Sequence, residues 1–143
     1  MNLTPVGFCG SLPMTVDECK IAGRAILLAL QWLHVNGFVH RDIRRLNVMR
    51  ANGTWFLIDL EWANYENEPL DGYNPTLRPP ESSDAGFCWA ASADMWQFGK
   101  LFESWNHLDD DGRNLVSRLL QDDHESRPSA GEALQHAFIS NAE

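Results

Sequence analysis

Two aspartates and an asparagine lie close together along the chain, in a segment rich in arginine. Asp42 precedes a predicted β-hairpin, Asn47 stands just before its first strand, and Asp59 follows its second strand. Because a hairpin doubles back on itself, all three side chains can reach the same mouth. Carboxylate and amide oxygens are hard ligands of the kind that magnesium prefers. The three residues therefore predict a site for a divalent metal ion and phosphate.

The positive charge of the chain is concentrated around these residues. Four of the eleven basic residues are arginines within ten positions, namely Arg41, Arg44, Arg45 and Arg50. Arginine suits bidentate contact with phosphate or carboxylate better than lysine does. The formal net charge is nonetheless −9, which argues against nucleic-acid or anionic-membrane binding. The cluster thus indicates a local phosphate site in an acidic protein.

The hydrophobic pattern predicts one mainly α-helical domain over residues 1–143. A capping-box sequence and a terminal Asn-Gly predict a buried central helix over residues 15–36. A short strand is expected over residues 38–39, a hairpin with an Asn-Gly turn over residues 48–60, and a long polar loop over 64–86. Helices return within residues 90–139. The separate helices expected there run from about 90 to 105, 112 to 121 and 129 to 139.

One motif in this pattern points to a family. The stretch HRDIRRLNV, residues 40–48, resembles the H-R-D-x-x-x-x-N catalytic loop of protein kinases. Further landmarks of that family follow in the same order: IDLE at 58–61, RPPE at 78–81, ADMWQFGKL at 93–101 and ESRPS at 125–129. The resemblance implies the fold of a kinase large (C-terminal) lobe, a helical bundle with one small β-hairpin that carries the catalytic-loop motif.

The resemblance also divides the chain into parts. These are a hinge-like N-terminal segment (1–14), the central helix (15–36), the catalytic loop (40–48), the activation segment (59–81) and a helical subdomain (90–139). All of them would belong to a single domain.

Individual roles follow from the resemblance. Asp42 would be the catalytic base that accepts the proton of the substrate hydroxyl. Asn47 and Asp59 would hold the Mg²⁺ ions that bridge the phosphates of ATP. Arg44 would steady the transferred phosphoryl group. Glu61, which replaces the glycine of the family's D-F-G motif, could add a metal ligand.

Four further residues would have regulatory or structural roles by the same resemblance. Arg41 would pair with a phosphate on the activation segment. Glu81 and Arg127 would form an ion pair that pins this segment to the helical core. Asp94 would accept hydrogen bonds from the backbone of the catalytic loop.

The parts that kinases use to cover ATP have no counterpart in this sequence. It contains no glycine-rich loop, and both lysines, Lys20 and Lys100, fall in predicted helices. Because phosphoryl transfer depends on positioning and charge stabilisation, we expect a pseudokinase that acts by binding, with little or no phosphotransfer alone. The exposed lobe interface would receive a protein partner. ATP and Mg²⁺ are implied by the resemblance only.

Two alternatives remain open. The chain could belong to an active ATP-dependent serine/threonine protein kinase whose small lobe lies outside it. It could also be a small-molecule phosphotransferase or another metal-dependent enzyme, because I-D-x-E at 58–61 resembles such enzymes. The sequence shows no secretion signal and no apolar run of about 20 residues. The three cysteines are an odd number, which argues against a disulfide framework and favours a reducing compartment. We therefore expect a cytoplasmic protein, and the short apolar runs predict no membrane segment.

Overall fold

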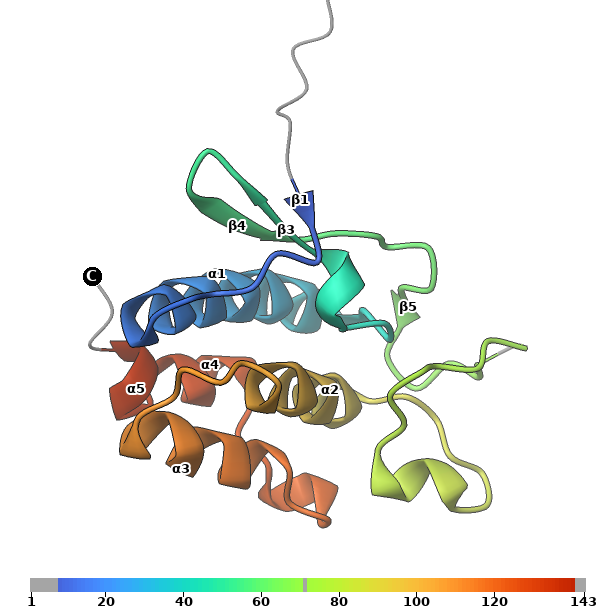
Figure 1. The fold of residues 1–143 in the computed structure, drawn as a ribbon. Helices are drawn as coiled ribbons and strands as arrows, with labels where there is room; N and C mark the ends of the chain where they lie inside the picture. Colours follow the sequence, from blue (N-terminus) through green and yellow to red (C-terminus); the bar gives the residue numbers. More distant parts are fainter. Residues whose placement is uncertain (1–7, 71, 141–143) are drawn as a thin grey trace, which may run out of the picture.

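The computed structural model describes residues 8–70 and 72–140. A long helix, α1 (Val16–Val35), crosses the middle of the molecule, with a small sheet on one side and the remaining helices on the other (Figure 1). Those helices are α2 (Ala91–Glu103), α3 (Asp110–Leu119), α4 (Ala130–Leu134) and α5 (Ala137–Ser140). Strand β4 and helix α4 pack against α1, and α3 packs against α2. The described residues include no helix with the length and hydrophobicity required to span a bilayer.

The predicted hairpin is confirmed. Strand β3 (Val48–Ala51) pairs with β4 (Thr54–Leu57) in antiparallel register, with Ala51 opposite Thr54. The two-residue turn between them is Asn52-Gly53, and both residues have positive φ, 53° and 77°. Only turns of this kind match the twist of the flanking strands, and Asn-Gly tolerates them well. The second strand is shorter than expected, so residues 58–60 lie beyond it.

Two further strand pairings were not predicted, although a short strand over residues 38–39 was, and that strand is confirmed. Strand β1 (Phe8–Cys9) adds to the hairpin beside β3, in what was expected to be a hinge-like segment. Strand β2 (Phe38–Val39) pairs with β5 (Asn64–Tyr65), inside the predicted polar loop. Two-residue strands are too short to show alternation. These strands form because each one pairs with a segment that is distant in the sequence.

Helix α1 begins and ends where the sequence predicts. The Glu18 amide donates to Thr15 Oγ1 at 3.0 Å, while the Glu18 carboxylate accepts from the Met14 amide, so the capping box is only half formed. The prediction that this helix is buried on nearly every face is wrong for one face, where Trp32 is 66 % and Val35 is 80 % exposed. The sheet covers one side of α1 and helices cover another, which leaves this third face open.

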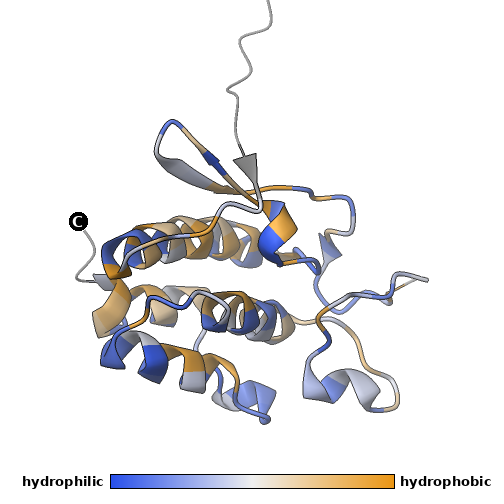
Figure 2. Ribbon diagram, viewed as in Figure 1, coloured by the Kyte–Doolittle hydropathy of each residue, from blue (hydrophilic) through white to orange (hydrophobic). Residues whose placement is uncertain are grey.

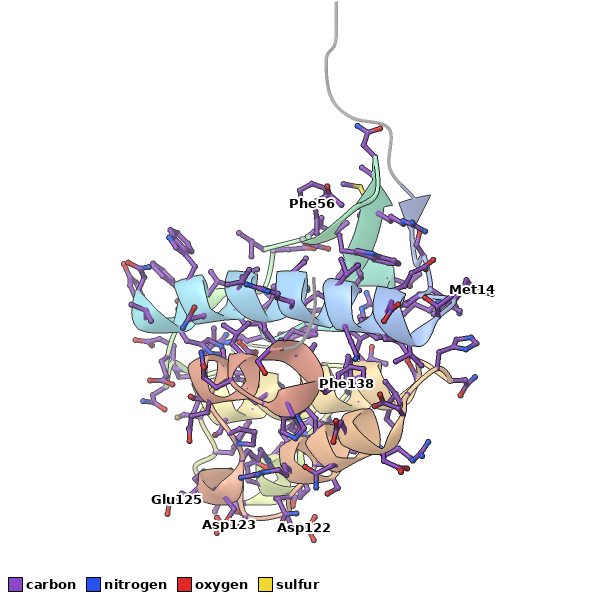
Figure 3. All side chains as sticks on the ribbon, turned by 90° about the vertical axis from the view of Figure 1, so that its left-hand side faces the viewer. Met14, Phe56, Asp122, Asp123, Glu125 and Phe138 are labelled. Carbon is purple, nitrogen blue, oxygen red and sulfur yellow. The ribbon has the colours of Figure 1, made fainter. Side chains whose placement is uncertain are left out.

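The core is one cluster of buried hydrophobic residues from α1, the other helices and the hairpin. Figure 2 colours the ribbon of these elements by hydropathy. Phe102 of α2 contacts Phe138 of α5 edge to face, with ring centroids 5.5 Å apart. Phe138 lies among the helices in Figure 3. A Cβ at Gly23 of α1 would stand 2.9 Å from the Phe102 ring. Glycine at this position therefore sets how closely the two central helices approach.

The last predicted helix is two short helices. Its start is confirmed, because Ser129 and Glu132 form a complete capping box at the beginning of α4. The helix stops at Gln135, and the His136 ring accepts a hydrogen bond from the Phe138 amide at 3.1 Å. This side chain supplies a new N-terminal cap, so α5 begins as a separate helix.

Candidate functional site

Asp94, near the start of α2, anchors the loop of residues 40–48 through hydrogen bonds to its backbone. Its buried carboxylate accepts hydrogen bonds from the backbone amides of His40 (2.7 Å) and Arg41 (2.9 Å). It also accepts from the indole of Trp89 (2.9 Å) and lies 2.8 Å from His34 Nε2 of α1. Burial raises the pKa of Asp94, but these partners, His34 first, outweigh it and lower the pKa. A fixed negative charge therefore anchors the loop.

Gln97, one turn further along α2, supports the same loop and was missed in the sequence. Its side-chain oxygen accepts from the Ile43 amide at 2.9 Å. Its amide donates to the carbonyls of Arg41 (3.0 Å) and Leu77 (2.9 Å). One buried side chain thus joins the 40–48 loop to the 59–81 segment. The sequence could have indicated this role, because Gln97 lies three residues after Asp94 and therefore on the same face of the helix.

Asp42 and Asn47 lie together in this loop. Both are buried, at 5 % and 4 % exposure. The Asn47 side-chain amide donates to the Asp42 carbonyl and to Asp42 Oδ2, each at 2.8 Å. A short 3₁₀ helix, η1 (Arg45–Asn47), turns the chain so that this contact forms. Arg44 Nε lies 3.1 Å from Asp42 Oδ1. The Asp42 carboxylate is therefore held on two sides.

Asp59 follows β4 and reaches the loop through its neighbour in the chain. The Ile58 amide donates to the Asn47 carbonyl at 2.8 Å, and the Ile58 carbonyl lies 2.9 Å from His40 Nε2. Asp59 itself is exposed and has a positive φ of 64°. Its Oδ1 accepts from the Glu61 amide at 3.1 Å. The backbone thus places Asp59 next to Asn47, while its side chain projects into solvent.

Tyr73, which sequence reasoning missed, contacts the loop of residues 40–48, because its hydroxyl donates to the Arg41 carbonyl at 3.4 Å. Burial raises its pKa most, followed by a hydrogen bond to Asp42 and the negative charges of Asp42 and Asp59, while Arg44 opposes them. The negative charges of both carboxylates therefore act on the same phenol. Tyr73 stands in an irregular loop, so no periodic signal marks it.

The donor atoms suit magnesium, and the number of carboxylates is small. Asn47 and Asp59 offer oxygen ligands, which is the chemistry that Mg²⁺ prefers, with water and phosphate completing its shell. Within residues 8–70 and 72–140, no group of three or more His, Cys, Asp or Glu side chains is arranged to hold a metal ion. Glu61 is exposed, and its backbone rather than its carboxylate contacts Asp59. Its role as an additional ligand stays a prediction.

Arg41 is buried and contacts the 59–81 segment directly. Its Nη2 donates to the Glu68 carbonyl at 2.7 Å. Its φ of 77° lies in the left-handed region, where a long side chain is uncommon and costs conformational energy. Asp94 and Gln97 hold the backbone in this conformation through the amide and the carbonyl of Arg41.

Glu81 and Arg127 form a bidentate ion pair. Arg127 Nη1 and Nη2 lie 2.7 and 2.8 Å from the two Glu81 oxygens. The Arg127 side chain is fully buried and also donates to the carbonyls of Gln121 and Ser92. Burial raises the pKa of Glu81, but Arg127 outweighs it and lowers the pKa. The pair ties the end of the 59–81 segment to the chain before α4.

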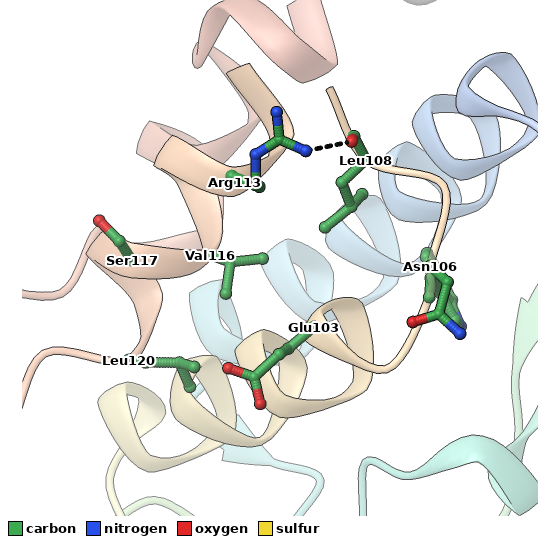
Figure 4. A pocket seen from close by; sticks show the side chains of 8 residues that line it. Glu103, Asn106, Leu108, Arg113, Val116, Ser117 and Leu120 are labelled. Atoms are coloured by element: carbon green, nitrogen blue, oxygen red, sulfur yellow. Dashed lines mark hydrogen bonds between the residues drawn. The ribbon is translucent and has the colours of Figure 1, made fainter. Parts of the chain in front are cut away.

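A pocket of about 410 Å³ opens elsewhere, between the end of α2 and α3 (Figure 4). Glu103, Val116 and Leu120 line it, and Arg113 donates to the Leu108 carbonyl at its edge at 2.9 Å. It lies beside the short connection between these helices, where kinases insert more chain by the resemblance. None of the predicted site residues lines this pocket.

Comparison with known proteins gives further evidence about the family of the chain. No protein-family model matches the chain. The chain is 31 % identical, over 86 % of its length, to Crinkler effector protein 8 of Phytophthora infestans. It is 30 % identical, over 94 % of its length, to a probable serine/threonine-protein kinase of Encephalitozoon cuniculi. It is 22 % identical, over 89 %, to the probable serine/threonine-protein kinase fhkC of Dictyostelium discoideum.

These relatives establish the family. The chain is a distant homologue of protein kinases over most of its length. It spans 22 %, 29 % and 28 % of the lengths of the three relatives, respectively.

Proposed function

We propose that this chain is a kinase-like large lobe that acts by binding a protein partner and has little or no phosphotransfer activity alone. The observation that carries the site assignment is the contact between the Asn47 amide and the Asp42 carboxylate and carbonyl. It holds a buried carboxylate in the same loop to which the residue before Asp59, Ile58, is hydrogen-bonded. A substrate hydroxyl and a metal-bound phosphate could meet there.

Each residue would then have a defined task. Asp42 accepts the proton of a hydroxyl, and Arg44, 3.1 Å from it, offers positive charge to a phosphoryl group. Asn47 and Asp59 would hold Mg²⁺, which would supply charge neutralisation for the phosphates of ATP. Arg41 and the Glu81–Arg127 pair keep the 59–81 segment in place.

Exposed apolar side chains beside the site favour a binding function. Leu46, which precedes Asn47, is 58 % exposed, and Leu60, which follows Asp59, is 57 % exposed. Trp62 is 36 % exposed. Apolar groups gathered beside a polar mouth mark a surface for another protein. A partner that covers them would also supply the grip on the nucleotide that this sequence lacks.

Calorimetric titration of the chain with ATP and Mg²⁺ tests the proposal. We expect no binding in the micromolar range by the chain alone. Asp122→Ala is a matched control for Asp59→Ala, because Asp122 is also exposed and lies at the end of the molecule opposite Phe56 (Figure 3). Micromolar binding that is lost in Asp59→Ala and kept in Asp122→Ala would overturn the proposal.

The relatives favour a second candidate function. Two of them are described as probable serine/threonine-protein kinases, and the chain spans less than a third of each. An active kinase whose remaining parts lie outside these 143 residues would use the same Asp42, Asn47 and Asp59. Phosphorylation of a generic protein substrate by a longer form, lost in Asp42→Asn, would select this alternative.

A further inference from the structure

One buried side chain, Gln97 of α2, holds the backbone on both sides of Asp42. Gln97 is 1 % exposed. Its Oε1 accepts a hydrogen bond from the Ile43 amide at 2.9 Å, and its Nε2 donates to the Arg41 carbonyl at 3.0 Å. Arg41 and Ile43 are the two neighbours of Asp42 in the chain. Gln97 therefore restrains the two peptide groups between which the Asp42 side chain projects.

The same amide group also bonds the 59–81 segment. Its Nε2 donates to the Leu77 carbonyl at 2.9 Å. A glutamine side chain carries two N–H donors and one acceptor oxygen on a single planar group, and Gln97 uses all of them. Because a buried donor without a partner costs free energy, the amide follows the Leu77 carbonyl when it moves. The planar group then carries that displacement to the atoms that hold Arg41 and Ile43.

Leu77 belongs to a bend that lies at the surface. Leu77 itself is half-buried, but Asn74 and Arg78 on either side of it are exposed. Arg78 Nη1 donates to Asn74 Oδ1, which closes the bend around Leu77. We call residues 74–78 the surface bend. The Leu77 contact of Gln97 thus connects this exposed part of the chain with the buried loop of Asp42.

We propose that Gln97 is a positioning residue that transmits a displacement of the surface bend to the backbone around Asp42. This inference rests on the role given to Asp42 under the proposed function. The connection is a continuous chain of hydrogen bonds from Leu77 through Gln97 to Arg41 and Ile43, which is a physical route for coupling between two parts of a protein. Whatever moves the surface bend then changes the placement of the candidate base without contacting it.

The substitution Asn74→Gly disturbs the surface bend and leaves Gln97 in place. It removes the side-chain acceptor of Arg78 and gives the backbone more conformational freedom. Asn106→Gly is a matched control, because Asn106 is also exposed and lies in the irregular connection between α2 and α3. The two variants carry the same chemical change, so only the place of the disturbance differs.

Amide hydrogen exchange, resolved by residue, measures the effect on the backbone beside the candidate base. The Ile43 amide donates to Gln97, whereas the His40 amide donates to another side chain of α2. In Asn74→Gly, the exchange rate of Ile43 should rise at least ~5-fold relative to that of His40, which corresponds to about one hydrogen bond. The ratio of the two rates cancels any change in global stability. Asn106→Gly should leave this ratio unchanged.

Gln97→Met tests whether the disturbance passes through this side chain. Methionine is unbranched and has no N–H donor, so the contact with Leu77 is lost. In the Gln97→Met background, Asn74→Gly should no longer change the ratio of the Ile43 rate to the His40 rate. A rise in this ratio of equal size in that background would overturn the inference.

An unchanged ratio in Asn74→Gly alone would also overturn the inference. This outcome decides the matter even if Gln97→Met does not fold, because Asn74→Gly keeps the buried amide. Micromolar binding of ATP with Mg²⁺ would overturn the proposed function alone, because the exchange measurements involve no nucleotide.

Discussion

Asp42 and Asp59 are the two carboxylates of the candidate site, and the molecule holds them in opposite ways. Asp42 is 5 % exposed and is bound by Asn47 and Arg44. The loop that carries it rests on the buried Asp94. Asp59 is exposed, and its carboxylate accepts a hydrogen bond from the amide of Glu61, two residues away. The Asp42 carboxylate, which would meet a hydroxyl, is thus held by partners in the core, whereas the Asp59 carboxylate, one of the two groups that would hold a metal, is supported locally.

The largest effect is expected at Asp94. Asp94→Asn removes the charge that receives four donors and turns an N–H group toward some of them. We expect the free energy of unfolding to fall by about 4 kcal/mol, as for breaking a buried charged network. Urea denaturation followed by circular dichroism measures this. Asp122→Asn, on an exposed loop, should change it by no more than about 0.5 kcal/mol. An equally small change in the free energy of unfolding for Asp94→Asn would contradict the claim that Asp94 anchors the loop of Asp42 in the core.

Acidification should sharpen the same contrast. The folded-state pKa of Asp94 lies below its ordinary value of 3.8, and that of Glu81 below 4.5. The stability that these groups contribute is therefore fully present above about pH 5 and is lost as the pH falls through their folded-state values. The difference in unfolding free energy between the unchanged protein and Asp94→Asn should narrow as the pH is lowered from about 6 to about 3. If the difference in unfolding free energy stayed constant with pH, the role of Asp94 as a charged anchor of the loop would be contradicted.

A smaller effect is expected within the loop of residues 40–48. Asn47→Ala removes two hydrogen bonds to Asp42 and leaves the Asp42 carbonyl without this buried donor. The unfolding free energy should fall by about 2 kcal/mol. Asn114→Ala provides a matched control at an exposed position of α3, where the side-chain amide contacts His136, and it should cost less. If the two variants lost equal stability, the Asp42–Asn47 contact would not be a buried support.

The smallest effect is expected at Asp59. Asp59→Ala should alter the unfolding free energy by no more than about 0.5 kcal/mol, because its carboxylate is exposed and locally bound. The midpoint of urea denaturation measures this. A loss comparable to that of Asn47→Ala would show that Asp59 is held as firmly as Asp42, and the two halves of the site would no longer differ.

The comparison also explains which features could be predicted from the sequence. The central helix, the hairpin and the ordered kinase motifs are local patterns, and each carries its own signal in caps, turns or spacing. The β2–β5 pair and the split between α4 and α5 depend on distant partners or on one side-chain contact. Gln97 and Tyr73 reach the site from a helix face and an irregular loop. Their contacts depend on how the elements pack, which spacing alone does not encode.

Amide hydrogen exchange tests the difference between the two halves most directly. The amides of His40, Arg41 and Ile43 donate to buried side chains of α2, so we predict that they exchange only through large-scale unfolding. The amides of Glu61 and Ala63 donate to Asp59 and Leu60 and should exchange at least ~100-fold faster through local opening. Equal protection of the two sets would contradict a site in which the loop of Asp42 is anchored in the core and the turn that follows Asp59 opens locally.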